Sequence, residues 1–197
     1  MMRRFPVRTD AREAKRVGFI FPCYGGGLPG GVEDAVKAVQ ISPGAYTFGI
    51  VQFAGYMGSG LHKIHKIHPL DYWAGMSHHG SCIWLIPHGL MVPPLSVKGA
   101  QKRSEKKAVA FAADIKAGKR CKKAPPRMAV CVAESAIFPQ IIKSKARKYT
   151  VNESCVGCGI CMAVCPRNNI RLENGRPVFG GDCMAAWAAS NSALQRP

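Results

Sequence analysis

The sequence lacks any run of about 18 apolar residues, the length that a membrane-spanning helix requires. Its basic start, residues 1–16, has no apolar periodicity and is followed only by a short apolar stretch, residues 17–22. We therefore predict a disordered leader over residues 1–16, with neither a membrane span nor a signal peptide. A cytoplasmic location is the expectation that follows.

Acidic residues are scarce, with 11 Asp and Glu against 28 Lys and Arg and a net charge of +17. The excess is uneven, because residues 98–148 hold 15 of the basic side chains and only three acidic ones. Such a segment could attract an acidic redox partner, an acidic lipid surface or nucleic acid, or it could be a solvated helix face. The lysine-rich run has no interleaved aromatic residues to stack on bases, so nucleic acid is the least favoured partner. We expect a redox partner protein with an acidic surface, and a membrane surface is possible but not favoured.

Several catalytic and nucleotide-binding signatures are missing. No G-x-x-x-x-G-K-[ST] sequence occurs, which excludes a phosphate-binding loop of that kind. Residues 25–30 fit G-x-G-x-x-G, but no acidic residue lies between Asp34 and Asp71 to bind the ribose of a dinucleotide. The spacing assigns no nucleophile with a partner base, which favours an electron carrier over an enzyme with its own substrate. His62, His65 and His68 recur every three residues, and we interpret them as a polar helix face rather than a metal site.

Cysteine, in contrast, is plentiful and concentrated. Four of the nine cysteines form the run C-x2-C-x2-C-x3-C-P, from Cys155 through Cys158 and Cys161 to Cys165. This is the spacing by which bacterial ferredoxins hold iron-sulfur clusters, and Gly157 and Gly159 would let the loop curl around one. A zinc knuckle or a disulfide pair is the alternative, but zinc sites draw paired cysteines from separate hairpins and disulfides need an oxidising compartment. In two-cluster proteins the fourth cysteine of such a run binds the other cluster.

The pattern of apolar residues predicts an α/β fold. Two strands, residues 17–22 and 46–53, are each followed by a glycine-rich loop and a helical pattern, over residues 32–39 and 61–67. Consecutive units of this kind indicate a parallel sheet with helices on its faces. We predict a third strand over residues 81–86 and a long helix over residues 96–117 that ends at Gly118.

The second half of the chain reads as a basic linker followed by a small domain. In residues 119–148, Pro139 interrupts the apolar segment 128–142 and is expected to split any amphipathic helix there. A short strand is predicted over residues 149–151, and a hairpin over residues 169–173 and 176–179 with an Asn174-Gly175 turn. The expected organisation is a leader (1–16), an α/β domain (17–118), a basic linker (119–148) and an iron-sulfur domain (149–197).

The two glycine loops could hold a flavin ring, with Tyr24 or Tyr56 stacked on it, or they could be tight strand-to-helix turns. The loop sequences FPCYGGGLP and AGYMGSG, together with the cysteine run and the hairpin, resemble the bacterial EFR family ferredoxins. In that family a flavodoxin-like domain is fused to a 4Fe-4S ferredoxin domain, and the similarity extends from about residue 17 to residue 183. The resemblance implies that the loops flank the isoalloxazine ring of FMN. The implied cofactor-binding residues are Tyr24, Gly25, Gly26, Gly27, Tyr56 and Gly58.

The chain departs from the family at both ends. No first strand with a Ser/Thr-rich phosphate-binding turn precedes residue 17, so we expect a truncated flavodoxin-like sheet that does not retain FMN. The second cysteine motif of the family would fall on Cys183, Ala186, Ala189 and Ala193, where only the first position is cysteine.

The sequence therefore predicts an iron-sulfur electron-transfer protein with at most one cluster, either a 4Fe-4S or a 3Fe-4S form. Its candidate metal ligands are Cys155, Cys158, Cys161, Cys165 and Cys183. Two alternatives are a basic binding module with a vestigial cluster site and a flavin-dependent reductase.

Overall fold

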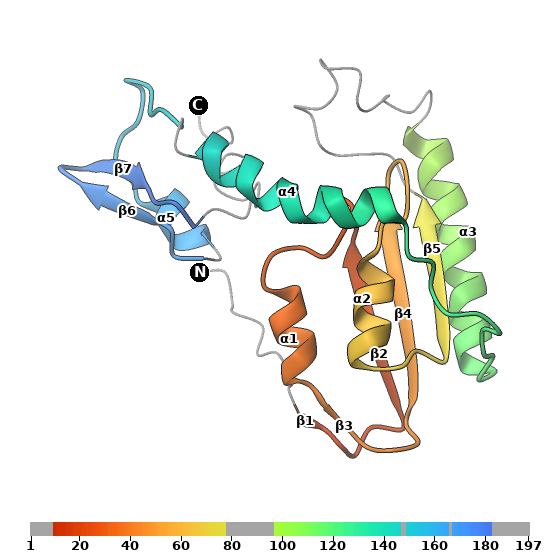
Figure 1. The fold of residues 1–197 in the computed structure, drawn as a ribbon. Coiled ribbons are helices and arrows are strands. Elements are labelled where there is room, and N and C mark those ends of the chain that lie inside the picture. The colour runs from red at the N-terminus through yellow and green to blue at the C-terminus, as the bar shows by residue number, and fades with distance from the viewer. Residues whose placement is uncertain (1–9, 78–96, 147–148, 166, 183–197) are drawn as a thin grey trace. The chain divides into compact units, whose positions relative to one another are not determined.

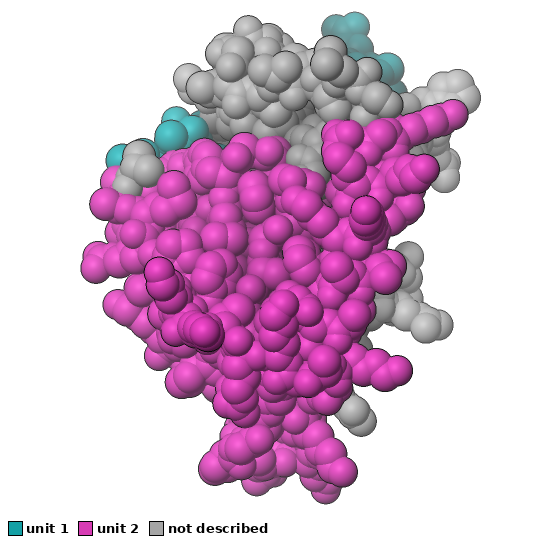
Figure 2. Space-filling model, turned by 90° about the vertical axis from the view of Figure 1, so that its right-hand side faces the viewer, with its two compact units in different colours: residues 1–7, 136–197 teal, residues 8–135 magenta. Residues whose placement is uncertain are grey.

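The computed structural model of the chain describes residues 10–77, 97–146, 149–165 and 167–182 (Figure 1). The chain divides into two compact units, which Figure 2 colours separately. Unit 2 comprises residues 8–135, and unit 1 comprises residues 136–197 together with residues 1–7. The expected linker is therefore divided between the two units.

Unit 2 is built on a parallel three-stranded sheet with the order β2-β4-β5. These strands are β2 (Arg16–Pro22), β4 (Tyr46–Phe53) and β5 (Tyr72–Ser77). The first two confirm the predicted strands, with Val17 aligned to Thr47. The third, β5, pairs with β4 and was not predicted, while the strand expected at residues 81–86 lies outside the described residues.

Helices cover both faces of the sheet, which confirms the α/β class (Figure 1). Helices α1 (Val32–Ala38) and α2 (Gly60–Ile67) pack on one face, and α3 (Val97–Lys116) packs on the other. The first face holds the main core, made of Phe19, Phe21, Val36, Val51, Leu61, Ile64 and Leu70. On the second face Tyr46, Tyr72 and Ala74 pack against Phe111 and Ile115 of α3.

Strand β2 lies at an edge of this sheet, because β4 is its only partner among the described strands. Its side chains alternate, so that Phe19 and Phe21 are buried while Ile20 between them is 71% exposed. The strand begins at Arg16 and ends at Pro22.

Part of the expected leader is ordered, which corrects the prediction for residues 10–16. Strand β1 (Asp10–Ala11) pairs in parallel with β3 (Gln40–Ile41), and Arg16 already belongs to β2. Two features hold this segment in place. The Tyr46 N–H donates to the Lys15 carbonyl at 3.0 Å, and the Arg16 guanidinium lies 5.8 Å from the centre of the Tyr46 ring.

Helix α3 confirms the long helix that the sequence predicts, and it ends just before Gly118, as expected. Gly118 has φ of +69°, and its N–H donates to the Ile115 carbonyl at 3.0 Å. Helix α4 (Ala129–Ala146) corrects a prediction, because it is one helix with Pro139 inside it. Proline removes one hydrogen bond from a helix without necessarily ending it, and α4 passes from unit 2 to unit 1 between residues 135 and 136. None of the described helices is long and apolar enough to cross a membrane.

Unit 1 contains the short helix α5 (Ile160–Val164) and a hairpin of β6 (Ile170–Glu173) and β7 (Arg176–Phe179). The hairpin confirms the predicted Asn-Gly turn, since Asn174 and Gly175 both have positive φ, +50° and +73°. Residues 149–151 do not form the predicted strand. The Tyr149 ring instead meets the Phe179 ring edge-on, with 5.5 Å between their centres.

Candidate metal centre

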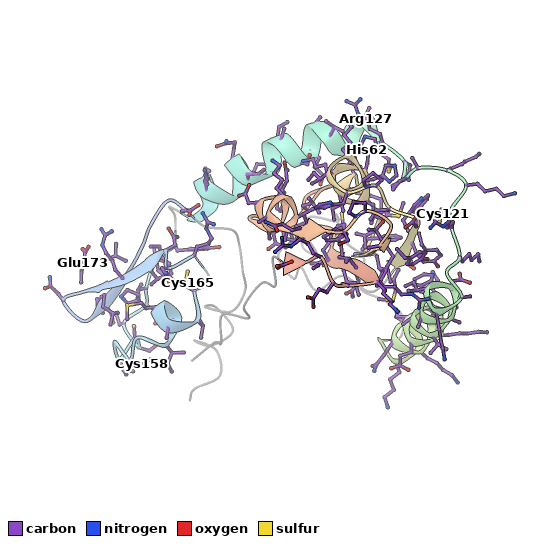
Figure 3. All side chains as sticks on the ribbon, turned by 90° about the horizontal axis from the view of Figure 1, so that it is seen from below. His62, Cys121, Arg127, Cys158, Cys165 and Glu173 are labelled. Carbon is purple, nitrogen blue, oxygen red and sulfur yellow. The ribbon has the colours of Figure 1, made fainter. Side chains whose placement is uncertain are left out.

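The cysteine run of unit 1 forms a glycine-hinged loop followed by one short helix (Figure 3). Gly157 and Gly159 have φ of +65° and +72°, a region that side-chain-bearing residues rarely adopt. A Cβ atom at Gly157 would also clash with the Gly175 carbonyl oxygen in the hairpin turn. The loop can therefore lie close to the hairpin only because glycine occupies this position. Cys161 follows in α5, which begins directly after Gly159.

Cys161 is sensitive to its burial and to the two cysteines that precede it in the run. The pKa of Cys161 is raised first by burial, and also by the negative charge that Cys155 and Cys158 carry when they ionise. Cys158 is exposed, whereas Cys155 and Cys161 are half-buried. Iron bound by these sulfurs would oppose both effects, because a coordinated thiol is deprotonated. The three residues fit the ligand set of a cluster.

Cys165 is held in a different environment, at the C-terminal cap of α5. Its sulfur accepts a hydrogen bond from the Asn169 N–H at 3.3 Å. The Asn169 side chain donates to the Gly180 carbonyl at 2.9 Å and accepts from the Asp182 N–H at 2.8 Å, and the Asn169 carbonyl accepts from the Gly180 N–H at 2.8 Å. Asn169 thereby ties Cys165 to the end of the hairpin, a role that the sequence reasoning missed. The turn-forming Asn-Asn pair at residues 168–169 was the available signal.

Among the described residues, no three His, Cys, Asp or Glu side chains converge closely enough to bind one metal ion. A 4Fe-4S cluster does not require such convergence, because each thiolate binds a different iron. Cys183, Ala186, Ala189 and Ala193 lie outside the described residues.

Comparison with known protein families identifies the segment that contains these cysteines. Residues 149–171 match the family model of the 4Fe-4S binding domain. The match supports a ferredoxin-type C-terminal domain, a 4Fe-4S cluster and a role in iron-sulfur electron transfer. It does not reach unit 2, so it carries no information on a flavodoxin-like fold. No curated protein and no solved structure matches the chain.

The two glycine loops of unit 2 lie side by side at the carboxyl ends of β2 and β4. Tyr24 and Gly27 exchange two backbone hydrogen bonds, of 3.1 and 3.0 Å, around Gly25 and Gly26. The Ser59 N–H donates to the Gly26 carbonyl at 2.8 Å, and a Cβ atom at Gly58 would lie 2.8 Å from the Cys23 sulfur. The structure thus brings together the loops that the sequence singled out for a flavin.

The first half of α4 packs against these loops. The Tyr56 hydroxyl donates to the Glu134 carboxylate, and the Ser59 hydroxyl donates to the Met128 carbonyl at 3.3 Å. Burial, followed by the hydrogen bond to Glu134, raises the pKa of Tyr56, and burial raises the pKa of the Cys23 thiol to about 11. A Cβ atom at Gly26 would lie 2.8 Å from a Glu134 oxygen, so side chains of α4 occupy space beside the loops. That the protein does not retain FMN stays a prediction. Its first reason is the missing phosphate-binding turn, and its second is that side chains of α4 fill space beside the loops.

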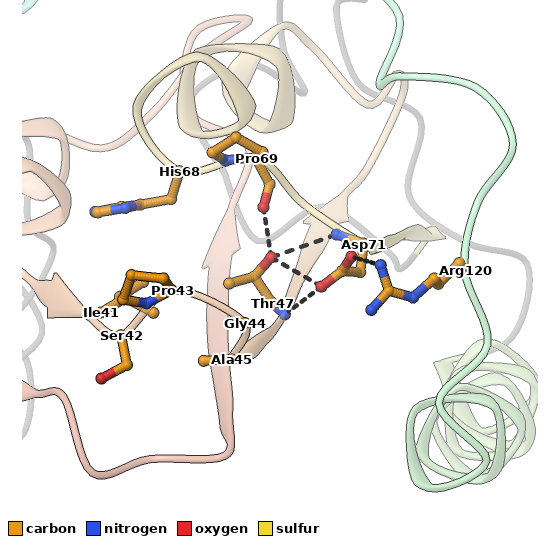
Figure 4. A pocket seen from close by; sticks show the side chains of 10 residues that line it. All are labelled: Ile41, Ser42, Pro43, Gly44, Ala45, Thr47, His68, Pro69, Asp71 and Arg120. Atoms are coloured by element: carbon orange, nitrogen blue, oxygen red, sulfur yellow. Dashed lines mark hydrogen bonds and ion pairs between the residues drawn. The ribbon is translucent and has the colours of Figure 1, made fainter.

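A cavity of about 320 Å³ lies at the opposite end of the sheet, beside Thr47, Asp71 and Arg120 (Figure 4). Its charged groups already have partners. Asp71 accepts from the Thr47 N–H at 2.9 Å and from Arg120 at 2.6 Å. We interpret this cluster as a support for the start of β4.

The three histidines of α2 and its C-terminal cap correct the expectation of a solvated polar face. They are half-buried, and their ring nitrogens contact backbone groups. His65 accepts from the Leu70 N–H at 2.9 Å, His68 lies 3.0 Å from the Val36 carbonyl and His62 lies 3.3 Å from the Pro125 carbonyl.

Proposed function

We propose that this protein is an electron carrier that holds at most one cluster, bound by Cys155, Cys158 and Cys161. The observation that supports this most directly is the match of residues 149–171 to the 4Fe-4S binding domain, on a loop that Gly157 and Gly159 allow to curl. A cluster bound there supplies one-electron redox chemistry. The protein supplies three thiolates, loop amides near the sulfurs and partial burial, which together set the reduction potential.

The fourth iron position defines the finer part of the proposal. In a two-cluster arrangement its ligand would come from the end of the second motif, where Ala193 stands. The fourth iron would then take a solvent ligand, be lost to leave a three-iron form, or bind Cys183. A second cluster would retain only Cys165 and Cys183, and two thiols are too few to hold a cube.

The test is to reconstitute the protein with iron and sulfide under anaerobic conditions, and then to count iron and record low-temperature EPR spectra. We expect about three to four irons per chain, the content of a single cluster. Cys158→Ser should lower the iron content sharply. Cys121→Ser serves as the matched control, because Cys121 lies outside the run, with its sulfur against the Trp73 backbone.

Two further results would bear on the cluster count. Restoring cysteine at Ala186, Ala189 and Ala193 together should raise the content towards about eight irons, the sum of two four-iron cubes. About eight irons in the unaltered chain would contradict the single-cluster proposal. A colourless protein without iron would favour the basic binding module, and a yellow protein would favour the flavin-dependent reductase.

A further inference from the structure

Helix α3 packs on the sheet through a narrow strip of its surface. Ala100 and Ser104 are buried, Phe111 and Ile115 are half-buried, and most of the remaining side chains are exposed. Helix α3 lies on the side of unit 2 that faces the viewer in Figure 2. Half of this helix is therefore available to another molecule.

The outward side of α3 has an apolar centre with basic ends. One line of exposed residues, spaced alternately by four and three, runs along it: Lys98, Lys102, Glu105, Val109, Ala112 and Lys116. Val109 in the middle is 71% exposed, and Ala112 and Ala113, one turn further along the same side, are exposed as well. A helix face that serves only to contact water would carry polar residues at its centre. An apolar centre with a charged rim is instead the arrangement of a protein interface.

The positive charge of this face is not neutralised within the chain. Every Asp and Glu of the sequence lies among the described residues, and none of them forms an ion pair with Lys102, Arg103 or Lys106. The two acids of α3 have other partners. Glu105 accepts a hydrogen bond from Gln101 at 2.9 Å, and Asp114 accepts from Lys119 and from the Tyr72 hydroxyl, both at 3.1 Å.

We propose that the outward side of α3, centred on Val109 and rimmed by Lys98, Lys102, Lys106 and Lys116, docks an acidic protein surface. The proposal rests on the proposed function, since the partner would be a protein that exchanges electrons with the cluster. A lipid surface fits less well, because alanine and one valine offer little apolar area to insert. Nucleic acid also fits less well, because no aromatic side chain on this face could stack on bases.

Docking through unit 2 would serve a cluster in unit 1 because the two are covalently linked. Once α3 has bound the partner, the chain keeps the cysteine loop near it. The loop then meets the partner at an effective concentration that the chain length sets, which is higher than its concentration in bulk solution. Salt screens such exposed charged contacts, so the complex is weaker at physiological salt, and an electron carrier needs weak complexes in order to turn over.

The test uses the full-length reconstituted protein and, as a probe, a small acidic [2Fe-2S] ferredoxin. The dissociation constant is measured from about 0.01 to about 1 M salt, over which the Debye length falls from about 30 to about 3 Å. Lys102→Glu combined with Lys106→Glu should weaken binding about tenfold or more at low salt. Val109→Ser should weaken it at all salt concentrations, because that substitution removes an apolar contact. Lys66→Glu with Lys143→Glu, at exposed positions of α2 and α4 that form no ion pair among the described residues, changes the net charge equally and should have little effect.

Three results would overturn the proposal: no binding of the acidic probe, equal weakening by the control pair, or a Val109→Ser variant that binds normally. Stronger binding to vesicles with about one-third phosphatidylserine, or to single-stranded DNA, lost in the same Lys102 and Lys106 variant, would also overturn it. Iron content is measured for every variant, and Cys155→Ser is tested for binding. A cluster-free protein that still binds the probe would separate failure of the proposed function from failure of the docking surface.

Discussion

At the scale of single residues, Asn169 does more than its place in a polar turn indicated. Its side chain joins Gly180 and Asp182 while its own N–H donates to the Cys165 sulfur. The sequence could predict the cysteine ligands, because their spacing is itself the signal. It could not predict the Asn169 hydrogen bonds or the contact of Tyr56 with Glu134. The Asn169 hydrogen bonds depend on how the ends of the hairpin close, and the Tyr56–Glu134 contact joins residues 78 positions apart in the chain.

Asn169→Ala tests this clamp. The substitution leaves the Gly180 carbonyl and the Asp182 N–H without their side-chain partner, and we expect it to destabilise unit 1 by about 1–3 kcal/mol. The measurement is hydrogen exchange of the amides of β6, β7 and residue 169, which should speed up. Asn168→Gly is the matched control, because Asn168 is exposed with φ of +50° and glycine adopts that conformation freely. Equal protection in both variants would show that the clamp contributes nothing.

At the scale of elements, the sequence predicted those whose pattern is local. The strands β2 and β4, helix α3 and the Asn-Gly hairpin each follow from periodicity or turn chemistry. Strand β5 was missed because its alternation is weak, with Trp73 and Met76 half-exposed and Gly75 placed beneath Met57 and Phe53. Helix α4 was not predicted as one helix because a proline usually ends or splits a helix. The packing of the start of α4 against the glycine loops could not be read from the sequence.

Pro139 gives α4 a specific weak point. It has no N–H to donate to the carbonyl four residues earlier, which belongs to Ser135, the last residue of unit 2. Pro139→Ala should restore this hydrogen bond and raise the free energy of opening the helix around residue 135 by about 1–3 kcal/mol. Slower hydrogen exchange in residues 135–143 would support the prediction. Unchanged exchange there would mean that the proline costs the helix nothing. Ala136→Gly in the same helix should have the opposite effect.

At the scale of the whole molecule, the two units are stabilised by different interactions. The main core of unit 2 draws on residues 17–73 alone, whereas the described part of unit 1 buries only Ile170 among its large aliphatic side chains. A domain with so small a core usually depends on a metal or another cross-link. Removing iron with a chelator should therefore increase hydrogen exchange throughout unit 1 and leave β2, β4 and α2 protected. Loss of protection in both units together would contradict this division.

The edge position of β2 has a consequence for how the protein behaves at high concentration. An exposed strand edge offers backbone groups to which a second chain can add, and Ile20 makes this one attractive to apolar segments. The strand resists such growth at both ends, because Arg16 brings charge and Pro22 has no N–H to offer. Within β2, the part that could template a fibril is the short stretch between these two residues. Replacing Pro22 would lengthen this pairing-competent stretch of β2. The proline directly before the glycine loop therefore also opposes amyloid-like assembly.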